Sequence, residues 1–382
     1  MRVAVITTGL GPGGAEMMLF KLLTALDRSR FELAVFSLRG EEAFADRLRA
    51  ANVPVHTAGL GGGPGALQRA RHVWRELVAF DPQVIQGWMY HGNLAALAAA
   101  RMLRGKRTVL WGVRQSLADL HREKRATSWI IRLGARWSRH VDAVVYNSAE
   151  GQRGHEAIGY ARERGICIPN GFDLQRFGPS ESARAALRRE CGIDPQALVV
   201  GYVARYHPVK DHAGLVVAAS QVAAAVPGVH FVMAGPGVDA SNAELARAIG
   251  AAGMQERIHL LGLRADVAAV TAGFDVAVCA SRAEGFPNIV GEAMACAVPC
   301  AVTDVGDCAA IVGDTGAVVP PSDPPAMAAA LTRLLRMAPS ERAQLGSAAR
   351  ARIQRDFSLE SVASRYSDLF ISPTASLSAC AA

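Results

Sequence analysis

Residues 1–16 read MRVAVITTGLGPGGAE, an apolar run followed by a glycine-rich turn. The run at 3–6 is typical of a β-strand, and a helical pattern begins near Ala15. A strand, a turn and a helix in this order predict the first βα unit of a parallel sheet. The same alternation of short β-branched runs with longer helical patterns continues along the chain. We therefore expect an α/β fold made of doubly wound, Rossmann-like sheets.

The expected strands form two groups, separated by a stretch at 169–182 that is rich in Gly, Pro, Asn and Asp. The first group lies at 3–6, 31–37, 84–88, 108–111, 143–147 and 167–168. The second lies at 198–204, 230–234, 258–261, 276–280, 299–302 and 317–319. Because 382 residues exceed what one core usually serves, we expect two domains, at 1–175 and 176–356.

The composition is that of a globular protein, with 51% hydrophobic and 20% charged residues. The seven cysteines show no CxxC pair and no histidine at zinc spacing, which favours reduced thiols over disulfides or a structural metal. No apolar run approaches the roughly 18 residues of a spanning helix, and the first strand is too short for a signal peptide. We expect a cytoplasmic protein whose small, polar tail at 372–382 is flexible.

The net charge of +7 is unevenly spread. Residues 1–175 hold 24 Lys and Arg against 15 Asp and Glu, which gives +9, whereas residues 176–382 hold 17 against 19, which gives −2. This asymmetry predicts that the first domain meets something anionic, such as a nucleic acid, a membrane surface or a lipid phosphate. Nucleic acid is the least favoured, because the basic residues interleave with the core pattern and form no recognised module.

Candidate binding residues follow the strands, because ligands of open parallel sheets bind beyond the strands' carboxyl ends. The glycines at 9–14 let backbone amides approach a phosphate at a helix N-terminus. Gly9, Gly11 and Gly14 also fit GxGxxG, the pattern of an NAD-binding oxidoreductase, although the second strand ends without the usual carboxylate. The loop is predicted to face a phosphate, and a plain tight turn is the alternative.

Three further residues at strand ends could act on a nucleotide sugar. His91 lies where a helix should start, and its neutral imidazole could donate to a sugar hydroxyl; a histidine at the core edge is the alternative. Arg205 and Lys210 flank a proline turn and could both reach one diphosphate, replacing a divalent ion. A surface salt-bridge pair is the alternative for these two cations.

The most informative stretch is 281–294, which reads SRAEGFPNIVGEAM. Pro287 suits the first helical position, which places Glu284 just before a helix and Glu292 about a turn and a half inside it. Glutamates beside the almost wholly apolar helix at 289–297 need partners. One carboxylate can accept from sugar hydroxyls and the other from ribose hydroxyls, while the helix N-terminus faces phosphate. Two solvated glutamates are the alternative.

Taken together, these motifs resemble the retaining glycosyltransferases of family 4, also described as glycosyl transferases group 1. The matching positions are the loop 11–16, the stretch 168–173 (IPNGFD), Arg205 with Lys210, the stretch 261–267 (LGLRADV) and Glu284-x7-Glu292. The resemblance implies a GT-B fold, in which two facing Rossmann-like domains hold the active site in the cleft between them. One departure is Asp307, where a second glycine is expected after Gly306.

The resemblance also implies a role for each part of the chain. The first domain would bind the acceptor and the second the nucleotide-sugar donor, while 357–382 would form a C-terminal helix returning to the first domain and a flexible tail. The implied catalytic residues are His91, Arg205, Lys210 and Glu284. The implied donor-binding residues are Gly13, Gly14, Arg205, Lys210, Arg264, Glu284, Gly285, Phe286, Asn288, Ile289 and Glu292. Within this set Arg264 would lie near the base, Glu292 would bind the ribose, and the amides of Phe286 and Asn288 would assist Glu284.

The implied reaction moves a hexosyl or N-acetylhexosaminyl group to a saccharide or lipid-linked acceptor in polysaccharide or glycoconjugate biosynthesis. The nucleotide sugar is a substrate, and neither a metal nor another cofactor is implied. A UDP-sugar is favoured by family frequency alone; the sugar, the acceptor, the linkage and the oligomeric state stay open. The alternatives are a non-catalytic nucleotide-sugar-binding subunit and a nucleotide-sugar 2-epimerase of the same fold.

A possible membrane contact lies in the stretch 121–140. Trp129, Leu133 and Trp137 recur every four residues with Ile130 beside them, which predicts one stripe of a helix. The arginines that flank this stripe are Arg125, Arg132, Arg136 and Arg139. Such a helix suits the headgroup region of an anionic membrane, at the cytoplasmic face. An amphipathic helix packed on the first sheet is the alternative.

Overall fold

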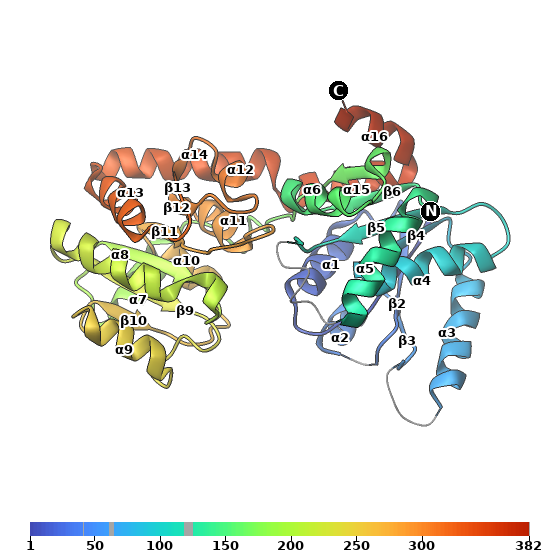
Figure 1. Cartoon of the computed structure of the whole chain (residues 1–382), viewed down its shortest axis with the longest axis horizontal. Helices are drawn as coiled ribbons and strands as arrows, with labels where there is room; N and C mark the ends of the chain where they lie inside the picture. The colour runs from blue at the N-terminus through green and yellow to red at the C-terminus, as the bar shows by residue number, and fades with distance from the viewer. Residues whose placement is uncertain (41, 61–64, 118–124, 382) are drawn as a thin grey trace. The chain divides into compact units, whose positions relative to one another are not determined.

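Two structural units make up the chain in the computed structural model, which describes residues 1–40, 42–60, 65–117 and 125–381. The first unit comprises Met1–Gly171 and Leu359–Ala382, and the second comprises Phe172–Ser358. Each unit is a parallel sheet with helices on both faces (Figure 1). The expected boundaries at 175 and 356 lie within a few residues of these. The α/β, GT-B-type architecture predicted from the sequence is confirmed.

The first unit has a seven-stranded sheet in the order β3-β2-β1-β4-β5-β6-β7. Its strands are β1 (Arg2–Thr7), β2 (Glu32–Ser37), β3 (Val55–Thr57), β4 (Val84–Trp88), β5 (Thr108–Val113), β6 (Ala143–Tyr146) and β7 (Gly165–Cys167). Edge strand β3 is absent from the sequence-based prediction. The strand order reverses between β1 and β4, so the loops that follow these two strands meet at one edge.

Helices from both ends of the chain cover this first sheet. They are α1 (Gly14–Ala25), α2 (Ala43–Ala50), α3 (Ala66–Phe80), α4 (Met89–Met102), α5 (Arg125–Trp137), α6 (Ala149–Ala157), α15 (Leu359–Ile371) and α16 (Pro373–Ala381). Helix α15 packs into the core beside α1, and Phe370 lies edge-on to Phe31 with 5.7 Å between ring centroids. Helix α16 occupies the tail that was expected to be flexible. No helix in the described part is long and apolar enough to cross a bilayer.

The second unit has a six-stranded parallel sheet in the order β10-β9-β8-β11-β12-β13. Its strands are β8 (Val199–Val203), β9 (His230–Ala234), β10 (Ile258–Leu260), β11 (Val276–Cys279), β12 (Cys300–Thr303) and β13 (Gly316–Val319). Its helices are α7 (Glu181–Cys191), α8 (His212–Ala225), α9 (Ala243–Ala251), α10 (Val267–Ala272), α11 (Asn288–Ala295), α12 (Cys308–Val312), α13 (Pro324–Arg336) and α14 (Pro339–Asp356). The order reverses between β8 and β11, which makes the edge beyond these strands the expected ligand site.

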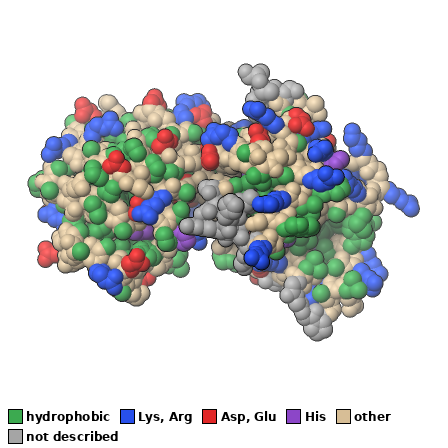
Figure 2. Space-filling model, viewed as in Figure 1, with side chains coloured by type: hydrophobic (Ala, Val, Ile, Leu, Met, Phe, Trp, Pro, Cys, Tyr) green, Lys and Arg blue, Asp and Glu red, His purple; other side chains and the backbone are tan. Residues whose placement is uncertain are grey.

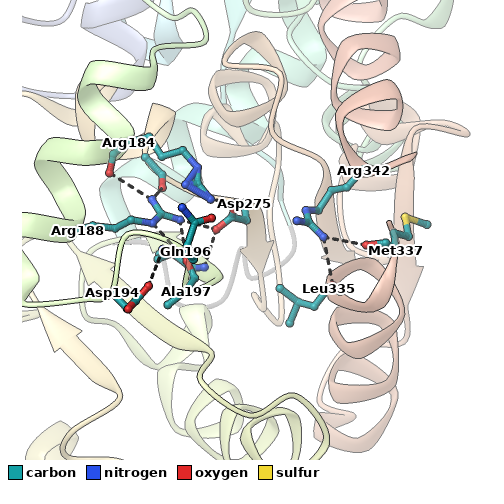
Figure 3. A network of polar contacts seen from close by, with 11 residues as sticks. Arg184, Arg188, Asp194, Gln196, Ala197, Asp275, Leu335, Met337 and Arg342 are labelled. Carbon is teal, nitrogen blue, oxygen red and sulfur yellow. Dashed lines mark hydrogen bonds and ion pairs between the residues drawn. The ribbon is translucent and has the colours of Figure 1, made fainter. Parts of the chain in front are cut away.

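A buried ionic network holds the opposite, amino end of β8 and β11 (Figure 3). Arg188 is 1% exposed and donates to Asp275 at 2.6 Å and to the Gly273 carbonyl at 2.9 Å. Asp275 also accepts from Arg184 at 2.8 Å and from the Val199 amide at 2.7 Å. Because the buried charges are paired and hydrogen-bonded, the network fixes α7 to both central strands. The amino end of the sheet is thus fixed by contacts that do not involve the loops at the carboxyl end.

Candidate active site

The loops that follow β8 and β11 are clamped together at the carboxyl edge of the second sheet. The first loop forms the short 3-10 turn η4 (Pro208–Lys210), after which Asp211 caps α8 by accepting from the Gly214 amide at 3.1 Å. From the second loop, Arg282 forms an ion pair with Asp211 at 2.8 Å. The Arg282 amide also donates to the Val209 carbonyl at 2.7 Å. The two loops therefore hold their side chains at fixed spacing.

The clamp brings Lys210 and Glu284 into contact. Lys210 Nζ forms an ion pair with Glu284 Oε1, and Ser281 Oγ donates to the same oxygen at 2.6 Å. The two charged side chains are only 19% and 11% exposed. Buried Tyr202 donates its hydroxyl to the Lys210 carbonyl at 2.7 Å, which fixes the backbone of the turn. A phosphate that binds Lys210 must share this cation with Glu284.

Helix α11 begins four residues after Glu284, one residue later than the sequence predicts. Pro287 is the N-cap with extended backbone, and Asn288 is the first helical residue, so the prediction of Pro287 at the first helical position was wrong. The helix also ends at Ala295, before the predicted limit of 297. No side-chain hydrogen bond caps its N-terminus. This end therefore presents backbone amides and the positive end of the helix dipole.

The loop between β12 and α12 supports the backbone of Glu284. Gly306 has φ of +55°, and a Cβ there would lie 2.5 Å from the carbonyl oxygens of both Glu284 and Gly285. Only glycine fits this approach and this backbone conformation. Asp307 donates its amide to the Gly285 carbonyl at 3.0 Å and has a negative φ. The departure from a second glycine thus leaves the loop able to hold Gly285.

Side chains on α11 and its approach divide between core and surface. Phe286 is buried and stacks on Phe172, with 6.0 Å between ring centroids, so only its backbone can face a ligand. Gly291 has no room for a side chain, because the same Phe172 ring occupies the space that its Cβ would need. Glu292 and Ile289 are half-buried and line a small cavity with Thr271 and Val203 among others. Glu292 is thus set apart from Glu284 by its surroundings.

The two predicted arginines stand in different environments. Arg205 is exposed, and no ion pair to it is found among the described residues. Arg264 is bound by Asp266 at 2.7 Å and by Glu190, and these hydrogen bonds raise its pKa. No hydrogen bond joins Arg264 to the Lys210–Glu284 pair. Its guanidinium is engaged in holding its own loop.

Two carboxylates, Glu16 and Glu42, lie at the glycine loop of the first unit, and the sequence analysis predicted no role for either. Gly13 caps α1 with extended backbone and Gly14 is the first residue of the helix. Glu42 accepts a hydrogen bond from the Leu10 amide, and the Glu16 carboxylate lies against Gly13. Burial raises the pKa of Glu16, and the nearby Glu42 adds to the effect. The loop predicted to face a phosphate is thus already lined by acidic groups.

His91 lies at the same edge of the first unit. It is the third residue of α4, and its side chain is largely exposed. Burial of part of the ring, together with Arg39, lowers the pKa of His91. Its neighbour Gly92 packs directly on the end of β1, because a Cβ there would lie 3.1 Å from Thr7 Cα. The lowered pKa favours the neutral imidazole, and the contact of Gly92 with β1 places the ring close in the fold to the glycine loop.

Helix α5 packs on the first sheet mainly through residues outside the predicted stripe, although Ile130 and Trp137 also contact the core of the first unit. Its buried residues are Ile131, Gly134 and Ala135. Trp129 is 65% exposed, whereas Trp137 lies under Arg101, whose Cζ is 4.4 Å from the ring centroid. Residues 121–124 of the predicted segment lie outside the described residues. The stripe is thus split, with only its Trp129 end fully facing solvent.

The chain matches two family models along most of its length. Residues 12–176 match the model described as Glycosyltransferase Family 4, and residues 197–337 match the model described as Glycosyl transferases group 1. The chain belongs to glycosyltransferase family 4. Lys210, Glu284 and Glu292 lie within the second matched region, and His91 lies within the first.

Individual relatives of this family 4 glycosyltransferase are named as glycosyltransferases too, and a solved structure shares its fold. The putative glycosyltransferase EpsF of Bacillus subtilis is 27% identical over 328 residues, which are 79% of each chain. The D-inositol 3-phosphate glycosyltransferase of Mycolicibacterium gilvum is 34% identical over 177 residues, 44% of this chain and 39% of that one. The structure of Anabaena Alr3699/HepE in complex with UDP superposes with a TM-score of 0.83 at 21% identity, over 97% of this chain and 100% of that one.

Proposed function

We propose that this glycosyltransferase moves a sugar from a nucleotide diphosphate donor to a hydroxyl of a saccharide or lipid-linked saccharide, with retention of the anomeric configuration. The observation that carries the proposal is the Lys210–Glu284 pair beside the uncapped N-terminus of α11. A cation and helix amides suit a diphosphate, and a carboxylate suits sugar hydroxyls. A UDP-sugar is our preferred donor, because structures of HepE contain UDP and UDP-glucose.

In the proposed step, the bond between the sugar C1 and the phosphate oxygen breaks. A bond forms on the same face between C1 and the acceptor oxygen, and the leaving phosphate takes the acceptor proton. Lys210 and Arg205 stabilise the charge that develops on the diphosphate, which lets the reaction proceed without a metal ion. His91, whose lowered pKa favours the neutral imidazole, donates a hydrogen bond to the reacting sugar.

The proposal also assigns the remaining donor contacts. Glu284 accepts from sugar hydroxyls, assisted by backbone amides at Gly285, Phe286 and Asn288. Glu292 accepts from the ribose hydroxyls, and Ile289 contacts the donor from the same helix, α11. Arg264, which forms ion pairs with Glu190 and Asp266, lies near the base of the nucleotide. Gly13 and Gly14 offer backbone amides to the donor phosphate.

The proposed reaction is tested by offering the purified chain a panel of nucleotide sugars and detecting released sugar and nucleotide by mass spectrometry. We expect one nucleotide sugar, a UDP-sugar, to be hydrolysed slowly without an acceptor and faster with one. Binding without any turnover would instead favour the non-catalytic subunit. Conversion of the sugar while it stays attached to the nucleotide would favour the 2-epimerase.

We also propose that α5 brings the first unit to an anionic membrane that carries the acceptor. Exposed Trp129 can insert at the headgroup level, and Arg132, Arg136 and Arg139 are exposed beside it. Figure 2 shows further Lys and Arg side chains spread over the visible face of the first unit. Together they favour contact with anionic lipid.

Vesicle co-sedimentation tests the membrane contact. We expect the chain to sediment with acidic vesicles at low salt, weakly with neutral vesicles, and to be released by salt. Replacement of Arg132, Arg136 and Arg139 by Ser should abolish sedimentation while slow donor hydrolysis continues. The matched control replaces Arg189, Arg247 and Arg333, exposed arginines of the second unit, by Ser. Binding that ignores the α5 arginines would point to a soluble acceptor.

A further inference from the structure

Among the described residues, hydrogen bonds reach only one of the two carboxylate oxygens of Glu284. Lys210 Nζ and Ser281 Oγ both donate to Oε1, and Cys279 Sγ lies 4.0 Å from the same atom. All hydrogen bonds to Glu284 from the described residues end on this oxygen. A carboxylate offers about four acceptor positions, shared by its two oxygens. Oε2 therefore keeps its acceptor capacity for a ligand.

Ser281 is itself held rigidly, which makes its hydroxyl a fixed reference point. The residue is completely buried, and its carbonyl accepts from Thr303 Oγ1 at 2.6 Å. Thr303 ends β12 and is 3% exposed, so the anchor comes from the strand next to β11. The Tyr202 hydroxyl lies 3.4 Å from Ser281 Oγ on the other side. The serine is thus part of the rigid sheet edge.

Lys210 cannot hold Glu284 in the same way. Its ammonium group sits on a flexible four-carbon stem, and the proposed function requires it to serve a diphosphate. When Lys210 turns toward that phosphate, Ser281 becomes the remaining strong donor to Oε1. A carboxylate without such a donor would be free to rotate and to turn Oε2 away from the sugar.

We propose that Ser281 is the positioning residue for Glu284. When Lys210 leaves the Glu284 carboxylate to bind the phosphate, the Ser281 hydroxyl keeps its hydrogen bond to Oε1. Oε2 then stays directed at a hydroxyl of the donor sugar. The inference rests on the proposed function, because it takes Glu284 as the sugar-binding carboxylate. It predicts that Ser281 acts only through Glu284 and has no part in binding the nucleotide.

The test is a double-mutant cycle with Ser281→Ala, Glu284→Gln and the double variant. Hydrolysis of UDP-glucose is measured as kcat/KM, and the Kd of UDP is measured by calorimetry. We expect Ser281→Ala to lower kcat/KM about 10- to 100-fold, as loss of a partner that orients a ligating side chain does elsewhere. The Kd of UDP should stay within about twofold of the wild-type value. In the Glu284→Gln background the same serine change should cost less than about threefold, because residues that act as one unit are not additive.

Two further variants separate positioning from folding. Thr315→Val removes a hydroxyl that is buried in the same unit and bonded to the Val312 carbonyl at 2.7 Å, and it should leave kcat/KM near the wild-type value. Ser281→Thr keeps the hydroxyl and should recover most of the activity that Ser281→Ala loses. If Ser281→Ala lowers the melting temperature strongly, this rescue still decides the question.

Additive losses in the cycle would overturn the inference, and so would equal weakening of UDP binding and UDP-glucose turnover. The activity of the single variant Glu284→Gln is evaluated first. If that variant retains wild-type turnover, or if the wild-type chain neither binds UDP nor hydrolyses UDP-glucose, the proposed function fails and the inference fails with it. If Glu284→Gln is impaired but Ser281→Ala behaves like Thr315→Val, only the inference fails.

Discussion

Glu284 and Glu292 have the same carboxylate group but lie in different surroundings. Glu284 precedes α11 and is tied to Lys210 and Ser281 at the sheet edge. Glu292 lies within α11, next to Gly291 and the Phe172 ring that packs on it. One carboxylate is therefore part of a charged pair in a loop, and the other belongs to a half-buried helix surface. The two should meet different parts of the donor.

The two glutamates are separated by calorimetry with UDP. We expect Glu292→Gln to weaken UDP binding about tenfold, the cost of one hydrogen bond to a charged group. Glu284→Gln should leave the Kd of UDP nearly unchanged while it impairs sugar transfer. Glu256→Gln, at an exposed position of the second unit, is the matched control. Equal losses of UDP affinity in both site variants would refute the division of roles.

How far single residues can be predicted depends on what surrounds them. Lys210 and Glu284 could be selected from the sequence because each follows an expected strand. Their mutual ion pair could not, because it joins positions 74 residues apart through two loops. Glu42 gave no signal either, since its contact with Leu10 depends on how the β2–α2 connection folds over the glycine loop. Long-range polar contacts of this kind require the fold.

Among the elements, the short connection between β12 and α12 requires glycine at position 306. Its positive φ and its approach to the carbonyls of Glu284 and Gly285 leave no room for a side chain. Gly306→Ala should therefore cost at least about 1 kcal/mol of stability and lower activity by displacing Glu284. Activity and melting temperature are measured together.

The control for this substitution is Gly253→Ala. Gly253 also has a positive φ, +65°, but nothing lies within 4 Å of the added Cβ. This variant should lose stability to a similar degree and keep its activity per folded molecule. If Gly306→Ala keeps full activity per folded molecule as well, the loop does not position Glu284.

Elements with a strong pattern were predictable, and weakly patterned ones were not. Strand β3 has three residues, includes His56 and follows Pro54, so it lacks the apolar run that marks the other strands. Helix α16 consists of small residues with little amphipathic character, and its composition suggested a flexible tail. On α5 the period of the tryptophans was recognised, but the buried residues are Ile131, Gly134 and Ala135, which lie outside that stripe.

In the molecule as a whole, each unit buries a neutral histidine, which makes stability depend on pH. His155 in the first unit is completely buried, with Tyr90 Oη at 3.0 Å and the Gly151 carbonyl at 2.7 Å from its ring nitrogens. Burial lowers the pKa of His155 to about 4. His212 in the second unit is 2% exposed, and burial lowers its pKa to about 4 as well.

Because these pKa values lie below the unfolded value of about 6.5, the unfolded chain binds protons that the folded chain excludes. The free energy of unfolding should therefore fall as the pH drops from about 6.5 to about 4, by about 3 kcal/mol for each histidine. The check is thermal unfolding across this range. His155→Gln should flatten the dependence for the first unit, whereas His207→Gln, at an exposed position, should not. A curve unchanged by His155→Gln would contradict the account.

The central claim is that the second unit neutralises a nucleotide diphosphate with its own cations and helix amides. The most direct measurement is sugar transfer or donor hydrolysis in excess EDTA, for the wild-type chain and for Lys210→Ala, with Lys106→Ala at an exposed position of the first unit as control. We predict that chelator leaves the wild type and the control active, and that Lys210→Ala lowers turnover about 100-fold or more. A strict requirement for Mg²⁺ or Mn²⁺, or a Lys210→Ala variant as active as the control, would contradict the claim.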